Sequence, residues 1–354
     1  MSPSRLATFT LCLALGGGCA QILGTDFDVV PLEGGGGGGV VPMGGGGQGG
    51  GSTSTGGAGG SGGLGSPETI WEGDWPYDVV VDDGFVYWSS PRGEAPGIYR
   101  VDKSGGSGEP FTPELPGANR LLLHEGALYF TAGMEGTSAT WRVGKCSLSS
   151  LQCEDLAYPQ GKPIGLAADG DDIYFTSGPT SVERVSRNGG KAQPILTVPS
   201  VASFLLVAHG YLWGTGLDNG KVWRIPLPIA AATIPSEQVD VQLANGLSEY
   251  GSTVAVGQLM PNGSIYHFGS FDTPLSVAEG QSTVADMTSH GGYLYWANFS
   301  GGEVMRVALA GGTPVVLASA EVSPNGVAAD DSFVYFTSHA EKVAGGAVRR
   351  APLP

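Results

Sequence analysis

Residues 284–318 carry the pattern from which the fold is predicted, and they read VADMTSHGGYLYWANFSGGEVMRVALAGGTPVVLA. Four short apolar runs, Val284–Ser289, Tyr293–Ala297, Val304–Leu309 and Pro314–Ala318, are separated by segments rich in Gly, Asn and Ser. Runs of this length with β-branched and aromatic residues, bounded by such segments, are typical of strands joined by hairpins. The stretch therefore predicts a unit of four short antiparallel strands.

The same unit recurs along the chain. Five copies are marked by an aromatic pair that begins with Tyr: Tyr87-Trp88, Tyr129-Phe130, Tyr174-Phe175, Tyr295-Trp296 and Tyr335-Phe336. Trp213 stands at the Tyr position of a further copy, and a weaker copy is centred on Val254. Neighbouring landmarks are 39 to 45 residues apart, so copies of about 41 residues account for residues 67–354. No stretch of this region has a convincing amphipathic-helix pattern.

The repeat length selects the architecture. Four strands in 40–45 residues is the period of a β-propeller blade, whereas ankyrin, TPR and leucine-rich units are shorter or helical. The last copy ends at Pro354 after its third strand, and Glu68–Glu72 precedes the first copy, where a fourth strand belongs. We therefore predict an all-β, seven-bladed β-propeller in which this N-terminal strand closes the last blade.

A basic residue follows each aromatic landmark at a similar distance. The series is Arg100, Arg142, Arg184, Arg224, Arg306 and Arg350, with His267 in the fifth copy. Because a half-buried charge without a partner is costly, we expect pairing with polar groups of neighbouring strands or loops. The alternative is that these arginines bind a ligand.

The repeats resemble the YWTD-type propeller and, more loosely, the seven-bladed streptogramin-lyase-like propellers. The likeness rests on the Tyr-Trp/Phe-Ser/Thr cores and the downstream Ile/Val-x-Arg strands. The aspartate of the YWTD motif is absent, and its place is taken by Ser90, Ala132, Ser177, Asn298 and Ser338. The lyases use a histidine and a magnesium ion on one face of the ring, where His339 is the candidate here, without a matching motif around it.

Composition excludes some functions. Glycine accounts for 61 of the 354 residues, charged residues for only 14%, and the net charge is −16. Nucleic-acid binding needs a basic surface, so no nucleic-acid partner is expected. The apolar residues are spread too thinly for several membrane spans.

The N-terminus predicts export and a lipid anchor. Arg5 precedes the apolar run Leu6–Leu15, which is too short to cross a bilayer and fits a signal peptide. The run ends in three glycines and Cys19, which resembles the lipobox of bacterial lipoproteins, although Gly16 stands where that motif prefers Leu. The resemblance implies cleavage after residue 18, acylation of Cys19, and, because Ala20 follows, the outer membrane or cell surface. The alternative is ordinary secretion with an unpaired cysteine.

Residues 19–66 form the predicted linker. The stretch Gly34–Ser66 is dominated by glycine and contains no charged residue, so it buries too little to fold. A Gly-rich coil of that length spans roughly 30 Å. Signal peptide (1–18), linker (19–66) and propeller (67–354) together resemble the surface lipoproteins of myxobacterial-type bacteria.

The remaining cysteines, Cys146 and Cys153, flank a predicted hairpin between the third and fourth strands of the second unit. In an exported protein this spacing favours a disulfide. A zinc site would need two more ligands nearby, and none is evident.

Candidate binding residues gather on the face where the predicted central channel opens. Asp78, Arg120, Asn245 and Asp286 are predicted near the starts of innermost strands, with Trp75, Tyr77, Lys162 and Arg92 around them. His339 is predicted on the same face, in the loop between the second and third strands of its unit. Convergent polar groups with aromatic neighbours favour a pocket at this mouth; alternatively, they only hydrate the channel. His124, His209 and His290 fall at turns of different blades, so we expect them around the ring and not on one metal ion.

These patterns predict a surface-displayed, monomeric module that binds a protein or a glycan, with the membrane reached through its lipid anchor. No catalytic residue, metal site or cofactor is predicted. The alternatives are a lyase or hydrolase with its site at the channel mouth, and a purely structural component of the cell envelope.

The anchor is tested by Cys19→Ser. Loss of the acylated thiol is expected to move the protein from the membrane fraction to the soluble fraction and to abolish incorporation of a labelled fatty acid. Unchanged fractionation and labelling would contradict the lipoprotein assignment.

Overall fold

The fold was determined from a computed structural model that describes residues 66–133, 141–198, 202–217, 220–229, 234–235, 237–339 and 345–354. The predicted signal peptide, Cys19 and almost all of the linker lie outside these residues. In the described part, no helix is long and apolar enough to cross a membrane.

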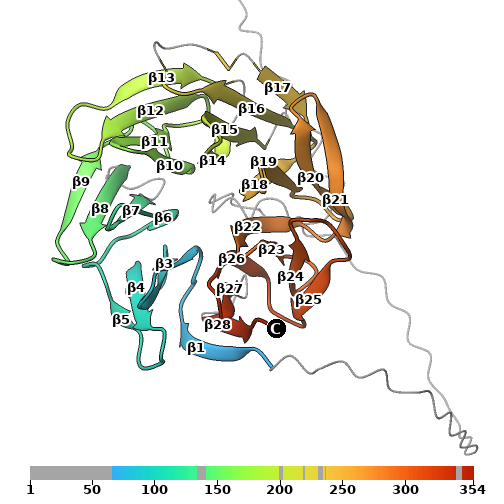
Figure 1. Cartoon of the computed structure of the whole chain (residues 1–354). Helices are drawn as coiled ribbons and strands as arrows, with labels where there is room; N and C mark the ends of the chain where they lie inside the picture. The colour runs from blue at the N-terminus through green and yellow to red at the C-terminus, as the bar shows by residue number, and fades with distance from the viewer. Residues whose placement is uncertain are drawn as a thin grey trace, which may run out of the picture.

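The described chain forms seven four-stranded antiparallel sheets arranged as blades around a central axis (Figure 1). Blade 1 comprises β2 (Val79–Val81), β3 (Phe85–Ser90), β4 (Gly97–Asp102) and β5 (Glu109–Pro110). Blade 2 comprises β6 (Leu121–His124), β7 (Ala127–Ala132), β8 (Arg142–Ser147) and β9 (Cys153–Ala157). Blade 3 comprises β10 (Leu166–Asp169), β11 (Asp172–Thr176), β12 (Ser181–Ser186) and β13 (Gln193–Thr197). Blades 4 and 5 comprise β14 (Ala202–Ala208), β15 (Tyr211–Gly216), β16 (Lys221–Pro226) and β17 (Glu237–Asp240); and β18 (Ala244–Tyr250), β19 (Thr253–Gln258), β20 (Gly263–Ser270) and β21 (Thr273–Gln281). Blades 6 and 7 comprise β22 (Val284–His290), β23 (Tyr293–Asn298), β24 (Glu303–Ala308) and β25 (Val315–Ala318); and β26 (Pro324–Ala329), β27 (Phe333–His339), β28 (Gly346–Pro352) and β1 (Glu68–Gly73).

The aromatic landmarks form the core between blades. Tyr87, Trp88, Tyr295 and Trp296 are at most 1% exposed, because both faces of a second strand pack against neighbouring blades. One core cluster, for example, joins Trp88 of blade 1 to residues of blade 7. The repeat of consecutive buried aromatics is therefore the sequence expression of a blade that is covered on both sides.

Ring closure is confirmed. β1 pairs antiparallel with β28, so the strand that opens the folded region completes the blade that ends it (Figure 1). Trp71 of β1 packs against Trp88 and Tyr99 of blade 1, with ring centroids 5.0 and 5.7 Å apart. The closing strand thus connects blade 7 to blade 1 by side-chain packing as well as by backbone pairing.

In five blades the loop that enters the first strand has the same unusual backbone conformation. The residue concerned lies four positions before the inner-strand residue that pairs with the position following the landmark. It has a φ between 45° and 67° at Trp75, Leu243, Thr283 and Ser323. The same position in blade 2 is Gly117, with φ of 72°. The left-handed conformation at Trp75 therefore belongs to the blade-to-blade connection and is not a special feature of that residue.

The basic series is a structural repeat, with two corrections to the sequence alignment. In five blades the landmark aromatic pairs across the sheet with the arginine of the series. The pairs are Tyr87 with Arg100, Tyr174 with Arg184, Trp213 with Arg224, Tyr295 with Arg306, and Tyr335 with Arg350. In blade 2, however, Tyr129 faces Lys145, and Arg142 lies at the start of β8. In blade 5 the residue that faces His267 is Ala255, so the assignment of Val254 was one residue too early.

Most members of this series have an acidic partner. Arg100 and Arg224 bind Glu109 and Glu237 of the fourth strands, and Arg350 binds Glu68 of β1. The expectation of structural pairing is therefore confirmed for these three.

The turn histidines lie apart, each bonded to the following blade. Nε2 of His124 lies 2.8 Å from the carbonyl oxygen of Gly170, and that of His209 lies 3.0 Å from the carbonyl oxygen of Thr253. His290 instead contacts a side chain, with Nε2 2.8 Å from Oδ1 of Asp331. Among the described residues, no group of three or more His, Cys, Asp or Glu side chains is arranged to hold a metal ion.

The predicted disulfide is confirmed. Cys146 and Cys153 face each other across β8 and β9 and are bonded, with Cα atoms 4.0 Å apart.

Candidate functional site

One register of the inner strands faces the centre of the ring. It is the residue immediately before the inner-strand residue that pairs with the position following each landmark: Asp78, Arg120, Gly165, Phe204, Gly246, Asp286 and Gly326. We call these seven residues the channel ring. The repeat sets their position, whereas the side chains themselves do not repeat.

The glycines of the channel ring allow neighbouring inner strands to approach closely. At Gly326, whose amide donates to the carbonyl oxygen of Tyr77, an added Cβ would lie 2.8 Å from that same oxygen. Any side chain at this position would push blade 7 away from blade 1.

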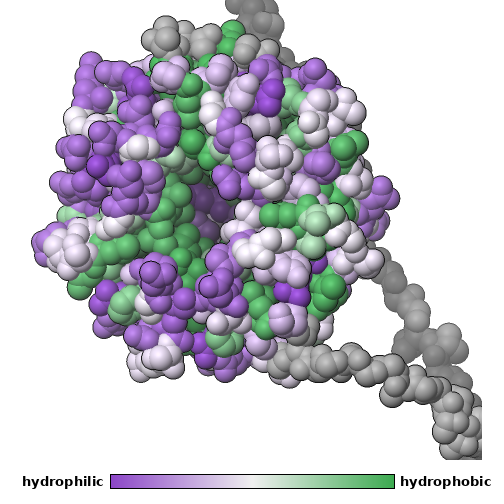
Figure 2. Space-filling model, viewed as in Figure 1, coloured by the Kyte–Doolittle hydropathy of each residue, from purple (hydrophilic) through white to green (hydrophobic). Residues whose placement is uncertain are grey.

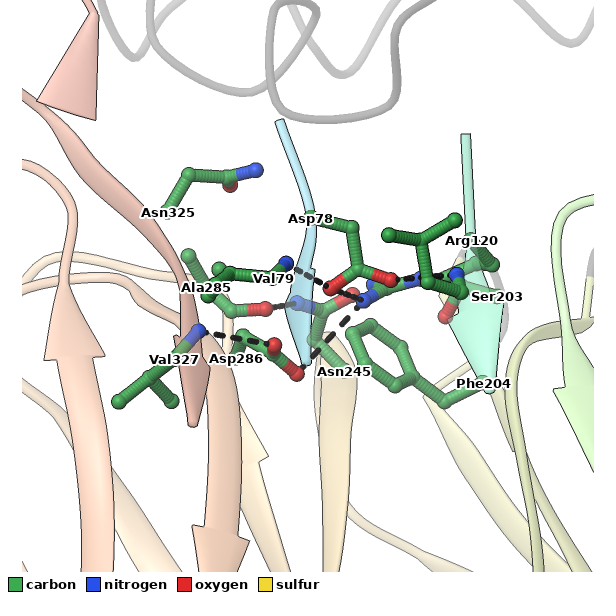
Figure 3. A network of polar contacts seen from close by, with 12 residues as sticks. Asp78, Val79, Arg120, Ser203, Phe204, Asn245, Ala285, Asp286, Asn325 and Val327 are labelled. Atoms are coloured by element: carbon green, nitrogen blue, oxygen red, sulfur yellow. Dashed lines mark hydrogen bonds and ion pairs between the residues drawn. The ribbon is translucent and has the colours of Figure 1, made fainter. Parts of the chain in front are cut away.

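Arg120 is the centre of the charged part of the ring. Its guanidinium lies between two carboxylates, with Nη1 3.7 Å from Oδ1 of Asp78 and 3.6 Å from Oδ1 of Asp286 (Figure 3). The guanidinium carbon also lies 3.7 Å from the ring centroid of Phe204 and 6.0 Å from that of Tyr77. One cation from blade 2 therefore contacts blades 1, 4 and 6 across the channel.

Each carboxylate also accepts a hydrogen bond from the next blade. The amide of Leu121 in blade 2 donates to Oδ2 of Asp78 at 2.8 Å, and the amide of Val327 in blade 7 donates to Oδ2 of Asp286 at 3.3 Å. Hydrogen bonds from backbone N–H groups stabilise a buried carboxylate in its charged form. The two acids thus join neighbouring blades in addition to pairing with Arg120.

Two asparagines also join neighbouring blades, and each stands immediately before a glycine of the channel ring. The amide nitrogen of Asn245 donates to the carbonyl oxygen of Ala285 at 2.8 Å (Figure 3), and that of Asn325 donates to the carbonyl oxygen of Tyr77 at 3.0 Å. Asn245 was predicted from the sequence as a site residue, whereas Asn325 was not. The Asn-Gly dipeptide that both blades carry at the same repeat position was the available signal.

A layer of buried hydroxyls supports the channel ring from behind. In five blades the backbone amide of the ring residue donates to a second-strand hydroxyl that is fully buried: Ser89, Thr131, Thr176, Thr215 and Thr337. Four of them are the Ser/Thr of the aromatic cores found in the sequence. Their role is therefore to hold the start of the inner strand in place.

Burial controls the protonation of the network. Desolvation raises the pKa of Asp286 to about 7, with Arg120 acting against this shift and Asp78 adding to it. Desolvation likewise raises the pKa of Asp78 and of the Tyr77 phenol. Burial opposes the charged form of Arg120, yet the two carboxylates hold its pKa above the ordinary value. With both acids ionised, the three charged groups of the ring carry a net negative charge.

The two acids of the network are buried at this level, with Asp78 4% and Asp286 8% exposed. Figure 2 shows a hollow at the centre of the ring with hydrophilic residues at depth and hydrophobic surface along one side. One small cavity, of about 10 Å³, lies beside Arg120, Phe204 and Asn325. This is about the space that one water molecule needs.

Trp75 and His339 form a second group, separate from the charged network. Their rings lie 5.6 Å apart, Phe299 lies 6.0 Å from His339 on another side, and the guanidinium of Arg92 lies 5.8 Å from the Trp75 ring. Burial lowers the pKa of His339 to about 4, so its imidazole is neutral at pH 7. Its Nδ1 is buried and has no hydrogen-bond partner in the described part of the chain.

The structure therefore brings together five of the sequence candidates, Tyr77, Asp78, Arg120, Asn245 and Asp286, in one network. It places Trp75 beside His339 in the second group. Sequence reasoning missed Phe204, although it stands at the repeat position of Asp78, Arg120 and Asp286.

Comparisons with known proteins identify the fold. No family model matches the chain, and no curated protein matches it by sequence. A chain in the crystal structure of the mitotic checkpoint complex superimposes with a TM-score of 0.64 at 12% identity, covering 84% of this chain and 96% of that one. The Pan2 WD40 domain of Neurospora crassa gives 0.59 at 10% identity, covering 81% and 96%. The computationally designed Ika8 protein gives 0.58 at 11% identity, covering 82% and 100%.

The network predicts a pH dependence of stability. Because the folded protein holds the proton of Asp286 more tightly than the unfolded chain does, its contribution to the unfolding free energy is lost as pH rises from about 4 to about 7. Over that window Asp286→Asn should gain about 2 to 4 kcal/mol relative to the wild-type protein in urea unfolding. The exposed Asp83→Asn in the β2–β3 turn is the control and should track the wild type. A constant difference between Asp286→Asn and wild type at all pH values would contradict the shift.

Proposed function

We propose that this protein is a lipid-anchored propeller that binds a macromolecular partner at the channel-mouth face and catalyses no reaction. The observation that carries the proposal is the burial and mutual pairing of the charged groups at the channel. Asp78, Arg120 and Asp286 are paired with one another, and both carboxylates also accept hydrogen bonds from backbone amides. Because these groups are already committed to one another, recognition is assigned to the surface around them.

The mouth offers suitable groups for binding. The indole of Trp75 is half-buried, in contact with His339 and Arg92, and close to the network through its neighbour Tyr77. Trp and Arg are the residues most often responsible for affinity in protein interfaces, especially when held rigidly. A protein partner is therefore our first candidate. A glycan is the second, because a partly exposed indole also stacks on sugar rings.

The enzymatic alternative has less support. A lyase or hydrolase would need an acid or base that a substrate can reach, whereas Asp78 and Asp286 are each committed to Arg120 and to a backbone amide. His339 is buried and neutral at pH 7. The groups with shifted pKa values are thus explained by burial and mutual pairing.

The anchor completes the proposal. Acylation of Cys19 and a linker that spans roughly 30 Å would hold the propeller near an outer membrane while leaving it free to rotate. A binding module displayed in this way meets partners across the cell envelope.

Trp75→Ala tests the binding face. Soluble residues 67–354, which contain all seven blades, are used for capture from the cell-envelope fraction and for a glycan array. Trp75→Ala is expected to weaken binding of the captured partner at least about tenfold, as for an interface hot spot.

Leu275→Ala, an exposed apolar residue on the outer strand β21, is the matched control and should bind normally. Equal affinity of wild type and Trp75→Ala for every captured partner would exclude the mouth face, and turnover of a bound compound would favour the enzyme.

A further inference from the structure

A groove of about 650 Å³ lies on the side of the ring opposite to the channel mouth. Its walls are the β6–β7 turn, the β8–β9 hairpin and the β12–β13 turn, and residues on its floor and sides include Ala127, Tyr129 and Lys145. Because hairpins joining first to second and third to fourth strands lie at the same end of every blade, equivalent places can be compared around the ring.

In four blades the equivalent place is filled by a stacked pair. An aromatic side chain two residues before the landmark, Phe85, Tyr211, Tyr293 or Phe333, lies beneath the guanidinium of the basic series. The distance from the guanidinium carbon to the ring centroid is 4.3 to 4.6 Å. The same ring lies 6.1 to 6.3 Å from the landmark aromatic. The stack is thus a regular part of a blade in this protein.

Blades 3 and 5 lack this ring but use the place otherwise. In blade 3 the position is Asp172, which pairs with Arg184 at 3.1 Å. In blade 5 it is Thr253, and the ring of Tyr250 lies 4.9 Å from that of His267. Both basic residues therefore have a partner supplied by their own blade.

Blade 2 has no aromatic side chain at this position, although the ring of His124 lies 6.2 Å from that of Tyr129, which is 2% exposed. The aromatic is replaced by Ala127, while the landmark Tyr129 is kept and Lys145 takes the place of the arginine. The groove is the volume that results, and it extends to the hydroxyls of Ser147 and Ser149 and to Asn188.

The walls of the groove are held rigidly. The Cys146–Cys153 disulfide fixes the β8–β9 hairpin, and Arg187 is paired with both Glu125 and Asp171. The ammonium of Lys145 is fixed by Glu154 at 3.0 Å and by the carbonyl oxygen of Arg187 at 2.5 Å. A site that is rigid before binding loses less entropy when a ligand enters.

We propose that this groove is a second binding site, which takes an aromatic side chain of a protein partner. The phenyl or phenol ring occupies the place that the chain's own aromatic fills in blades 1, 4, 6 and 7. The ring lies against Ala127 and beside the ammonium of Lys145, and the groove hydroxyls bond a phenolic oxygen when one is present. The site is on the other side of the ring from the channel mouth, so it stands whether or not that face binds a partner.

The test uses the full-length protein and p-cresol, the side chain of tyrosine, in saturation-transfer NMR. Wild-type protein is expected to bind p-cresol with a Kd of about 1 to 10 mM, as suits a ligand of this size. Ala127→Phe supplies the missing ring from within and should reduce the p-cresol signal at least about tenfold without lowering the melting temperature. Thr253→Phe, the same repeat position in blade 5, is the control and should bind p-cresol like wild type.

Lys145→Met gives an independent variant, because it removes the ammonium and keeps the aliphatic stem. It should weaken p-cresol binding about two- to fivefold. The proposal is wrong if wild-type protein gives no p-cresol signal, or if folded Ala127→Phe and Lys145→Met both bind p-cresol like wild type. It is also wrong if maltose, and not p-cresol, gives a signal that Ala127→Phe removes, since the groove would then bind sugars.

Discussion

The guanidinium of Arg120 lies between the carboxylates of Asp78 and Asp286, and the centre of the ring is organised around this contact. Two acids from blades 1 and 6 are buried here, where unpaired negative charges would be strongly destabilised. A planar cation is suited to the gap because it can approach both carboxylates and still stack on Phe204. The glycines at the other channel-ring positions then let the remaining inner strands approach one another.

Closure at the outside of the ring complements this contact. β1 pairs with β28, and Trp71 packs against the aromatic residues of blade 1, so the two ends of the folded region stabilise each other. Inside, the carbonyl oxygen of Tyr77 accepts hydrogen bonds from Asn325, Gly326 and Thr337 of blade 7. The junction between the first and last blades is therefore bonded at both its inner and outer edges.

The fold was predictable because its determinants repeat. Buried Tyr-Trp/Phe pairs and the hydroxyl that follows them serve the same purpose in blade after blade, so their spacing revealed the number and order of the strands. In blade 5, where the landmark aromatic is lost, the predicted position was one residue away from Ala255. In blade 2 the series was assigned to Arg142 because it is an arginine, whereas the Val-x-basic pattern of Val143 and Lys145 marks the residue that faces Tyr129.

The site was predictable only in part. Asp78, Arg120 and Asp286 stood out as charges at the starts of inner strands, but their pairing depends on which blades face each other across the channel. Phe204 is an ordinary apolar residue in the sequence, and only the three-dimensional ring places it beneath the guanidinium. The groove in blade 2 is of the same kind, since the replacement of one aromatic by Ala127 has meaning only when the other blades are superimposed.

The proposed functions follow from this division between centre and surface. If the channel network is structural, the two ends of the ring are left for recognition, one with Trp75 at the mouth and the other with the groove of blade 2. The most direct test of that central claim is urea unfolding of Arg120→Met beside the triple variant Asp78→Asn, Arg120→Met, Asp286→Asn. Arg120→Met alone leaves two buried carboxylates unpaired and should cost about 3 to 5 kcal/mol, and the triple variant should regain at least about 2 kcal/mol of this. An Arg120→Met protein as stable as wild type, or a triple variant no more stable than Arg120→Met, would contradict the account.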